Sequence, residues 1–287
     1  MTTKVQLVDI GANLAHEAFA DDFNEIITNA QEAKLCHIII TGTDIATSNT
    51  AQLLASERPQ FLSSTVGFHP HIAKMVTQEQ LQTAERLIQF DHVVAIGETG
   101  LDFNRNYSSQ EDQLRIFEYH LELATKIDKP LFLHQRDAHE TFFPMLKKYR
   151  HQISGGVIHC FTDTADALRD YLELDMYIGI TGWICDERRG QDLQQLVNQI
   201  PLNRLLIETD APYLLPRTLK PRPRSRRNEP AHLIEVAKTI ALFTEHSLQE
   251  VVDHTCSNAR ALFKLPIEDT PLKHPYKLQR HQSSQIK

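Results

Sequence analysis

The sequence predicts an α/β protein built as a (β/α)8 barrel of the TIM type. Short apolar runs of strand length alternate with longer segments of helical periodicity, as expected for βα units around a parallel sheet. Eight such repeats occupy most of the 287 residues, which agrees with the size and order of a TIM barrel. A doubly wound sheet is the alternative. It is less favoured because no glycine-rich dinucleotide motif follows the first apolar run.

The eight predicted strands follow one another along the chain as apolar runs bounded by polar or turn-forming residues. They cover residues 5–10 (VQLVDI), 37–41 (HIIIT), 62–67 (LSSTVG), 93–97 (VVAIG), 130–134 (PLFLH), 156–161 (GVIHCF), 176–181 (MYIGIT) and 204–208 (RLLIE). The carboxyl ends of all strands meet at one mouth in such a barrel. The residues that end these runs are therefore the first candidates for an active site.

The clearest helix lies between the fourth and fifth predicted strands. Ser108 and Glu111 have the spacing of a capping box, and Leu114, Phe117 and Leu121 then recur on one helical face. The other intervals show the same periodicity more weakly. After residue 263 the periodicity ends, so we expect a barrel domain over residues 1–265 and a polar tail over residues 266–287 that carries no catalytic residue.

Composition and charge argue against several classes of function. The formal net charge is -7 and the pI is about 6.1, which argues against a protein that coats nucleic acid or a membrane through its overall field. No apolar stretch reaches the roughly 18 residues of a membrane-spanning helix, and the first residues lack a signal-peptide core. The four cysteines show no C-x-x-C spacing, which suits a reducing compartment. We expect a cytoplasmic protein with no membrane contact and no obligate protein partner.

Metal-ligating residue types stand at the ends of four predicted strands. The fourth run is followed by Glu98, the fifth ends at His134, the sixth carries His159 near its end, and Asp210 follows the eighth. Taken singly, a histidine at a strand end is more often a hydrogen-bonded core residue, and a carboxylate there often caps the next helix. Together, a glutamate and two imidazoles supply three ligands and leave positions open for water and substrate. That arrangement is typical of a catalytic metal site.

Six stretches of the chain carry a resemblance to a known family. They are VGFHPH (66–71), IGETGLDFNRN (96–106), HQRDAHE (134–140), GGVIHCF (155–161), ITGWICDERRG (180–190) and IETDAPYLLPR (207–217). These stretches resemble the signature blocks of the TatD family, metal-dependent deoxyribonucleases with an amidohydrolase-like barrel. The resemblance spans about residues 5–263. It implies a divalent-metal hydrolase of DNA phosphodiester bonds, working from the 3′ end, preferring single strands and also acting on RNA.

The resemblance assigns roles to individual residues. The bridging carboxylate of the family, which also acts in catalysis, falls on Glu98, and the two histidine ligands fall on His134 and His159. Asp210 matches the aspartate of the catalytic site, which we expect to contact the metal and to act as a base. His69 matches a position that faces the substrate in relatives.

The first predicted strand departs from the pattern of most relatives. Where they have His-x-His, this chain has Gly11 and Asn13. Glycine has no ligand atom, and an amide oxygen is a far poorer ligand for a transition metal than an imidazole. A subgroup of the family shares this Gly-x-Asn, so the change is compatible with activity. We expect one metal position to be weak, and we expect strain if Gly11 occupies a backbone conformation closed to other residues.

The chemistry can also be derived from the residue types. Hydrolysis of a phosphodiester needs a deprotonated water and relief of charge on the phosphate oxygens, and a divalent metal supplies both. Asp210 is suited to orient or deprotonate that water, unless it only caps the following helix. Two imidazoles tolerate zinc, whereas phosphate chemistry favours magnesium or manganese. We expect a divalent cation, with magnesium or manganese favoured over zinc.

A basic segment in the eighth βα loop is the candidate contact for a polyanion. It reads RTLKPRPRSRRNEP over residues 217–230 and contains no acid until Glu229. Its position at the catalytic face leads us to expect that Arg222, Arg224 and Arg226 bind the phosphates of DNA, together with Arg136. The alternative is a solvated basic loop.

Two features after the seventh predicted strand have open interpretations. Residues 186–189 (DERR) form a second basic candidate, and Trp183, the only tryptophan, either stacks on a base or fills the core. Two other functions also stay open. A related barrel could hydrolyse an amide, a lactone or a phosphotriester, and a barrel without the first two histidines could bind a ligand without catalysis.

Overall fold

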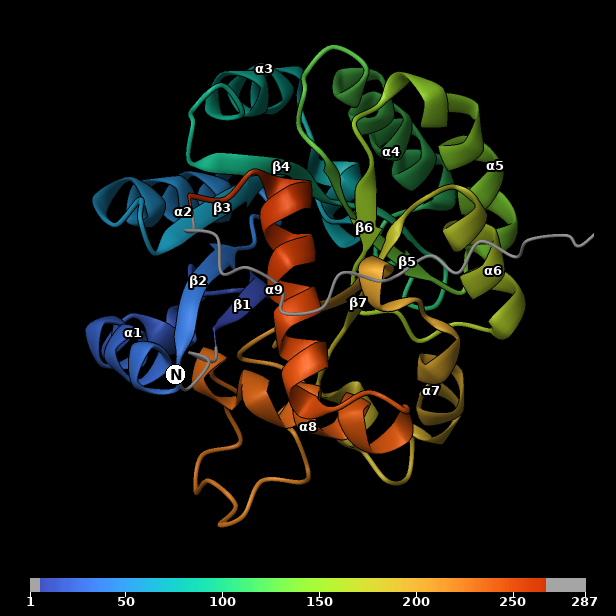
Figure 1. The fold of residues 1–287 in the computed structure, drawn as a ribbon. Helices are drawn as coiled ribbons and strands as arrows, with labels where there is room; N and C mark the ends of the chain where they lie inside the picture. The colour runs from blue at the N-terminus through green and yellow to red at the C-terminus, as the bar shows by residue number, and fades with distance from the viewer. Residues whose placement is uncertain (1–5, 267–287) are drawn as a thin grey trace, which may run out of the picture.

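The structure is a computed structural model and describes residues 6–266. Eight parallel strands form one sheet in sequential order (Figure 1), which confirms the predicted barrel and excludes the doubly wound alternative. The strands are β1 (Leu7–Ala12), β2 (Leu35–Ile40), β3 (Leu62–Val66), β4 (Val93–Asp102), β5 (Leu131–Arg136), β6 (Gly156–Ile158), β7 (Tyr177–Ile180) and β8 (Leu205–Ile207).

Helices follow the strands and surround the sheet (Figure 1). They are α1 (Phe23–Glu32), α2 (Ile45–Glu57), α3 (Gln78–Leu87), α4 (Gln110–Ala124), α5 (His139–Tyr149), α6 (Ala165–Glu173), α7 (Gln191–Leu196), α8 (Leu233–Phe243) and α9 (Leu248–Phe263). The capping box expected at Ser108 and Glu111 is wrong by one residue: Ser109 caps α4 and accepts a hydrogen bond from the amide of Asp112. Ser108 instead accepts from the amide of Lys74.

The barrel is closed where its first and last strands meet. The amide of Asp210 donates to the carbonyl of Gly11 at 2.8 Å, and the amide of Asn13 donates to the carbonyl of Ala211 at 2.7 Å. Both hydrogen bonds lie at or just beyond the carboxyl ends of β1 and β8. The seam between the two ends of the chain therefore passes through the mouth where the candidate site residues were expected.

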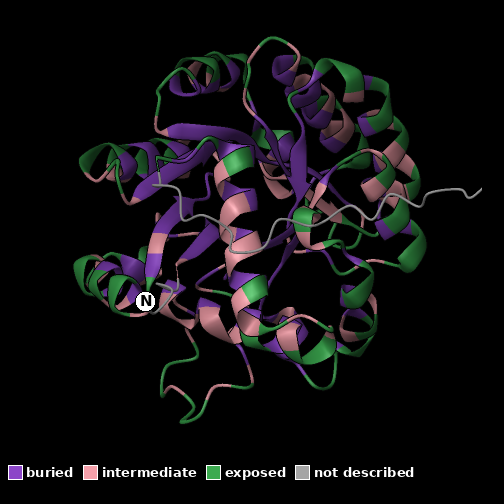
Figure 2. Cartoon of the chain, viewed as in Figure 1, coloured by how far each residue is buried: buried purple, intermediate pink, exposed green. Residues whose placement is uncertain are grey.

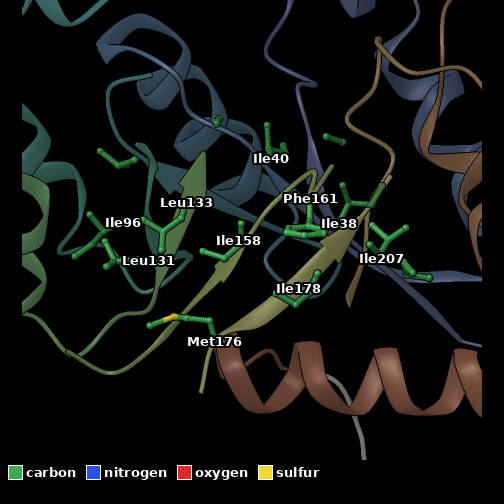
Figure 3. Close-up of a cluster of buried hydrophobic side chains, with 14 of the residues drawn as sticks. Ile38, Ile40, Ile96, Leu131, Leu133, Ile158, Phe161, Met176, Ile178 and Ile207 are labelled. Carbon is green, nitrogen blue, oxygen red and sulfur yellow. The ribbon is translucent and has the colours of Figure 1, made fainter. Parts of the chain in front are cut away.

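Two apolar clusters form the core, and the strands are their common wall. The larger cluster packs strand side chains such as Ile38, Leu131 and Ile178 against the surrounding helices (Figure 3), and nearly all strand residues are buried (Figure 2). The second cluster contains alternate strand residues such as Ile39 and Phe132, which point into the barrel.

Helix α9 closes the amino-terminal end of the barrel and lies in front of the strands in Figure 1. Its residues Ala259, Leu262 and Phe263 belong to the cluster inside the barrel. Asn258 of the same helix donates to the carbonyls of Leu202, at 2.7 Å, and Leu205, at 2.8 Å, where β8 begins. Apolar contacts and backbone hydrogen bonds thus fix α9 across this end.

Three of the differences between predicted and observed strand ends change where a site residue lies relative to its strand. β4 continues to Asp102, so Glu98 lies inside the strand, because the chain pairs with β5 as far as Asp102 and Arg136. β5 likewise continues two residues past His134. β6 ends at Ile158, before His159, because Cys160 has a left-handed φ of 48° that no strand accommodates.

Three expectations about the rest of the chain can be compared with the structure. Within residues 6–266, no helix is long and apolar enough to cross a membrane. All four cysteines, at positions 36, 160, 185 and 256, are free thiols. The barrel domain expected over residues 1–265 is described from residue 6 onward, whereas the polar tail from residue 267 lies outside the described residues.

Candidate active site

The carboxyl ends of the strands open into one cleft of roughly 1100 Å³. Six of the side chains predicted for the site line it: His69, Glu98, His134, Arg136, His159 and Asp210. They come from β4, β5 and the segments that follow β3, β6 and β8, so residues distant in sequence converge as the barrel rule predicts.

A buried carboxylate, Glu98, is the centre of the cluster. Its Oε1 atom lies 2.8 Å from Nε2 of His159, 2.9 Å from Nδ1 of His134 and 3.3 Å from Nε2 of His69. The candidate ligand atoms of His69, Glu98 and His134 all lie within 4.8 Å of one another. His69, expected to face the substrate, therefore also stands among the groups that could hold a cation.

The electrostatics of the cluster follow from burial and mutual charge. Burial alone would raise the pKa of Glu98, but the three imidazoles outweigh it and hold that pKa well below its usual value. Burial would lower the pKa of His159, yet Glu98 and Glu208 raise it well above 6.5. Asp102 and Glu98 raise the pKa of His134 in the same way. His69, where burial dominates, has its pKa lowered to about 4.

Two carboxylates that the sequence analysis left without a role stand behind the histidines. Asp102 lies 3.6 Å from Nε2 of His134 and 2.7 Å from Nε2 of His71. Glu208, completely buried, lies 3.5 Å from Nδ1 of His159 and accepts a 2.6 Å hydrogen bond from the amide of Cys160. Carboxylates in this position fix the orientation of an imidazole and raise its basicity. Both residues lie in stretches that resemble the TatD signature blocks, but the sequence does not show in which direction their side chains point.

Asp210 lies beside Glu98 and is positioned from the first strand. Asn13 donates a 2.9 Å hydrogen bond from its amide to Oδ1 of Asp210. Burial, with the charges of Glu98 and Glu208, raises the pKa of Asp210 to about 7. The residue that was weighed only as a poor metal ligand, Asn13, thus acts as a hydrogen-bond donor that orients Asp210.

Packing around position 11 explains why this residue is a glycine. A Cβ atom there would collide with the Glu208 carboxylate and would lie 2.8 Å from the ring of Phe132. Gly11 lies in β1 and does not have a positive φ, so the strain expected from an unusual backbone conformation is wrong. The missing side chain makes room for Glu208, which occupies the space that a residue at position 11 would need.

The donor set fits a divalent cation. Oε1 of Glu98 faces one ring nitrogen each of His69, His134 and His159 in a buried cluster. Oxygen and imidazole ligands of this kind suit manganese, zinc and, with more oxygen atoms from water or substrate, magnesium.

The basic loop after β8 divides into anchored and free arginines. Arg217 donates to both carboxylate oxygens of Glu187, and Arg227 pairs with Asp22 at 2.6 Å and with Glu229 at 3.0 Å. These ion pairs hold the two ends of the loop, which extends away from the barrel in Figure 1.

The three arginines predicted to bind phosphates, Arg222, Arg224 and Arg226, are exposed and make no hydrogen bond or ion pair with any residue from 6 to 266. Arg222 lines a second, smaller cavity next to the cleft, whereas Arg224 and Arg226 line neither. Trp183 borders both cavities and also packs partly against the core.

A parallel eight-stranded barrel with a buried glutamate and histidines at its carboxyl-terminal mouth defines the class of metal-dependent hydrolase barrels. The family model described as TatD related DNase matches residues 8–264, and the chain belongs to this family. It is similar to the "3'-5' ssDNA/RNA exonuclease TatD" of Pantoea vagans, with 46% identity over 90% of this chain and 100% of that protein. The protein of that name from Klebsiella pneumoniae is 43% identical over 91% of this chain and 99% of its own length.

Solved structures show the same architecture. A TatD family hydrolase from Entamoeba histolytica superposes with a TM-score of 0.82 at 28% identity, covering 91% of this chain and 99% of that one. The organophosphorus hydrolase of Deinococcus radiodurans has a TM-score of 0.60 at 10% identity, covering 90% and 92%. At that identity the likeness shows the fold alone.

Proposed function

We propose that this protein is a metal-dependent exonuclease that removes nucleotides from the 3′ end of single-stranded DNA and also acts on RNA. The observation that carries the proposal is the buried Glu98 carboxylate, whose Oε1 atom lies within 3.3 Å of three imidazoles at the floor of the cleft. Family membership and the names of relatives at 46% identity support the reaction and its direction.

Glu98, His134 and His159 would hold the cation in this proposal, with Asp210 at its edge. When bound, a divalent metal lowers the pKa of a water molecule and draws charge from the phosphate oxygens. Magnesium and manganese suit the phosphate oxygens best, and zinc suits the imidazoles. Asp102 and Glu208 orient the rings of His134 and His159, and Gly11 leaves the space that Glu208 needs.

Asp210 is the proposed general base. Its Oδ1 atom is held by Asn13, and its carboxylate lines the cleft next to Glu98. A carboxylate that is fixed by one oxygen presents the other to a water molecule. His69 and Arg136 line the same cleft and would contact the substrate phosphate. Arg222, Arg224 and Arg226 would add charge along the strand that leaves the cleft.

An amide, lactone or phosphotriester hydrolase is the second candidate, because such barrels share this fold. The basic loop favours the nuclease, because a neutral substrate would offer no ligand to the cationic side chains at positions 222, 224 and 226, which have no partner among residues 6–266.

The proposal is tested by removing one ligand. His134→Ala should lose tightly bound metal and at least about a thousandfold in activity on end-labelled single-stranded DNA, while remaining folded. Metal is measured by elemental analysis, and EDTA should abolish wild-type activity. His139→Ala is the matched control, because the side chain of His139 is equally exposed at 18% but pairs with Asp170 outside the cleft. Unchanged metal content in His134→Ala would return that histidine to a purely structural role.

A further inference from the structure

A second cavity of about 240 Å³ adjoins the active-site cleft. It lies between the loops that follow β7 and β8, and its wall contains four arginines, Arg188, Arg189, Arg217 and Arg222. Trp183, Arg189 and Leu214 line both this cavity and the cleft, so the two cavities are adjacent and share a wall. We call the smaller cavity the arginine pocket.

A buried aspartate organises the pocket. Asp186 is 3% exposed, and its carboxylate lies 2.9 Å from Arg189, 3.4 Å from Arg188 and 3.7 Å from Arg217. Its pKa is held well below the usual value, because hydrogen bonds from the arginines outweigh its burial. Three guanidinium groups are therefore gathered around one carboxylate instead of being spread over the surface.

Trp183 fixes one of these arginines at the boundary with the cleft. The guanidinium of Arg189 lies 4.5 Å from the centre of the Trp183 ring, and the indole N–H donates to the carbonyl of Arg189 at 3.2 Å. A planar guanidinium held in this way can contact a phosphate with its edge. Trp183, which borders both cavities, thus positions the guanidinium of Arg189 and also packs against the core.

The pocket keeps an excess of positive charge. Four arginines face two carboxylates, Asp186 and Glu187, which leaves a formal excess of two positive charges. Arg222 accounts for one of these two charges, since within residues 6–266 its guanidinium has no hydrogen bond or ion pair. Such a concave cationic site has the chemistry of an anion receptor, and its volume suits one phosphate with part of a sugar and excludes a duplex.

From this geometry we infer that the arginine pocket binds an internal phosphodiester of the single strand under digestion, at a fixed distance from the bond that is cleaved. The inference rests on the proposed nuclease function. A strand whose 3′ end lies at Glu98 passes Trp183 and Arg189, the shared wall, before it reaches Arg222. The pocket would therefore set the minimum length of an efficient substrate.

The experiment compares two variants that each remove one unpaired positive charge from the same loop. Arg222 lines the pocket, whereas Lys220, also exposed and unpaired among the described residues, lines neither cavity. Steady-state kinetics of wild type, Arg222→Gln and Lys220→Gln are measured on DNA strands from two to ten nucleotides. Each strand is prepared with and without a terminal phosphate, and metal content is measured in parallel.

We expect Arg222→Gln to raise KM roughly five- to tenfold on the ten-nucleotide strand, while kcat and metal content stay at the wild-type values. On the dinucleotide, which is too short to reach the pocket, KM should not change. The slope of log KM against log salt on the long strand should fall by about 0.7, the contribution of one phosphate contact. Lys220→Gln should match wild type at every length.

Three outcomes would overturn the inference. One is an equal effect of both variants on KM, which would show that the loop acts through its overall positive charge and that the pocket does not bind a particular phosphate. Another is a KM effect of Arg222→Gln that depends on a terminal phosphate and not on length, which would make the ligand a strand end. The third is a wild-type protein that degrades no strand with any divalent metal, and it would remove the proposed function as well. The first two outcomes leave the proposed function intact.

Discussion

The two ends of the barrel are built from the same eight strands but bury opposite kinds of side chain. At the amino-terminal end, Ala259, Leu262 and Phe263 of α9 cover an apolar interior. At the carboxyl-terminal end, carboxylates and imidazoles are buried instead, and several of their polar atoms make no hydrogen bond within residues 6–266. The comparison indicates that apolar contacts at one end stabilise the barrel, while the other end holds costly buried charge for chemistry.

The largest expected effect tests the closed end. Leu262→Ala should lower the free energy of unfolding by about 2–5 kcal/mol, because it leaves a cavity under α9 that the barrel cannot fill. Urea unfolding followed by circular dichroism measures the change. Metal content per folded chain should stay at the wild-type value, because Leu262 is at the opposite end from Glu98.

Leu242→Ala is the matched control, since Leu242 is also a helical leucine but is 76% exposed, against 9% for Leu262. Its effect should be within about 0.5 kcal/mol. Equal effects of the two substitutions, or loss of metal from folded Leu262→Ala, would contradict the separation between the two ends.

Histidines sharpen the comparison, because their surroundings shift their pKa values in opposite directions. Carboxylates raise the pKa of His134 and His159 at the mouth. His120, buried in α4 beside Phe68, has its pKa lowered to about 4 by burial. The unfolded chain binds a proton at His120 below about pH 6.5, whereas the folded chain does not until about pH 4.

His120 should therefore contribute stability that is complete above pH 6.5 and is lost as the pH falls towards 4. Its share of the free energy of unfolding is about 3–4 kcal/mol, at about 1.4 kcal/mol per pH unit. His120→Leu should flatten the pH dependence of the free energy of unfolding by that amount, whereas His151→Leu, at the exposed surface, should not. An unchanged profile in His120→Leu would show that the ring is hydrated in the folded protein.

The smallest expected effect tests the packing of the mouth. Gly11→Ala places a methyl group against the Glu208 carboxylate and the Phe132 ring, so we expect a loss of about 1–3 kcal/mol in unfolding free energy. Displacement of Glu208 should also release the ring of His159 and weaken metal binding, measured by calorimetry. Gly11→Ala, Glu208→Ala restores the space and should recover part of the lost stability. If Gly11→Ala alone matches wild type, then Glu208 moves freely and does not orient His159.

Much of the fold was predictable because βα periodicity is a local signal. All eight strands were found, and Glu98, His134, His159 and Asp210 were correctly placed at one mouth, since a barrel brings all carboxyl ends together. Strand limits were harder to predict. Glu98 was expected at the end of its strand, yet β4 continues to Asp102 because it pairs with β5 up to that residue.

Partners between side chains could not be predicted, because they depend on contacts that no spacing encodes. Asn13 and Asp210 are 197 residues apart and meet only at the seam between β1 and β8. Glu208 was visible in the sequence, but its contact with His159 depends on which way a buried strand end faces. The arginines of residues 217–227 read as one basic loop, whereas the structure divides them into paired and unpaired groups.

The seam also sets when the site can exist during synthesis. The hydrogen bonds that join Asp210 to Gly11 and Asn13 connect the first strand to the last, so a chain growing on the ribosome carries β1 long before its partner is made. At about 5–20 residues per second, the 197 residues between Asn13 and Asp210 take roughly 10–40 seconds. Until then Asp210, the proposed base, has not been synthesised, so the growing chain lacks part of the proposed active site. The complete site can therefore form only after the last strand has been made and the barrel has closed.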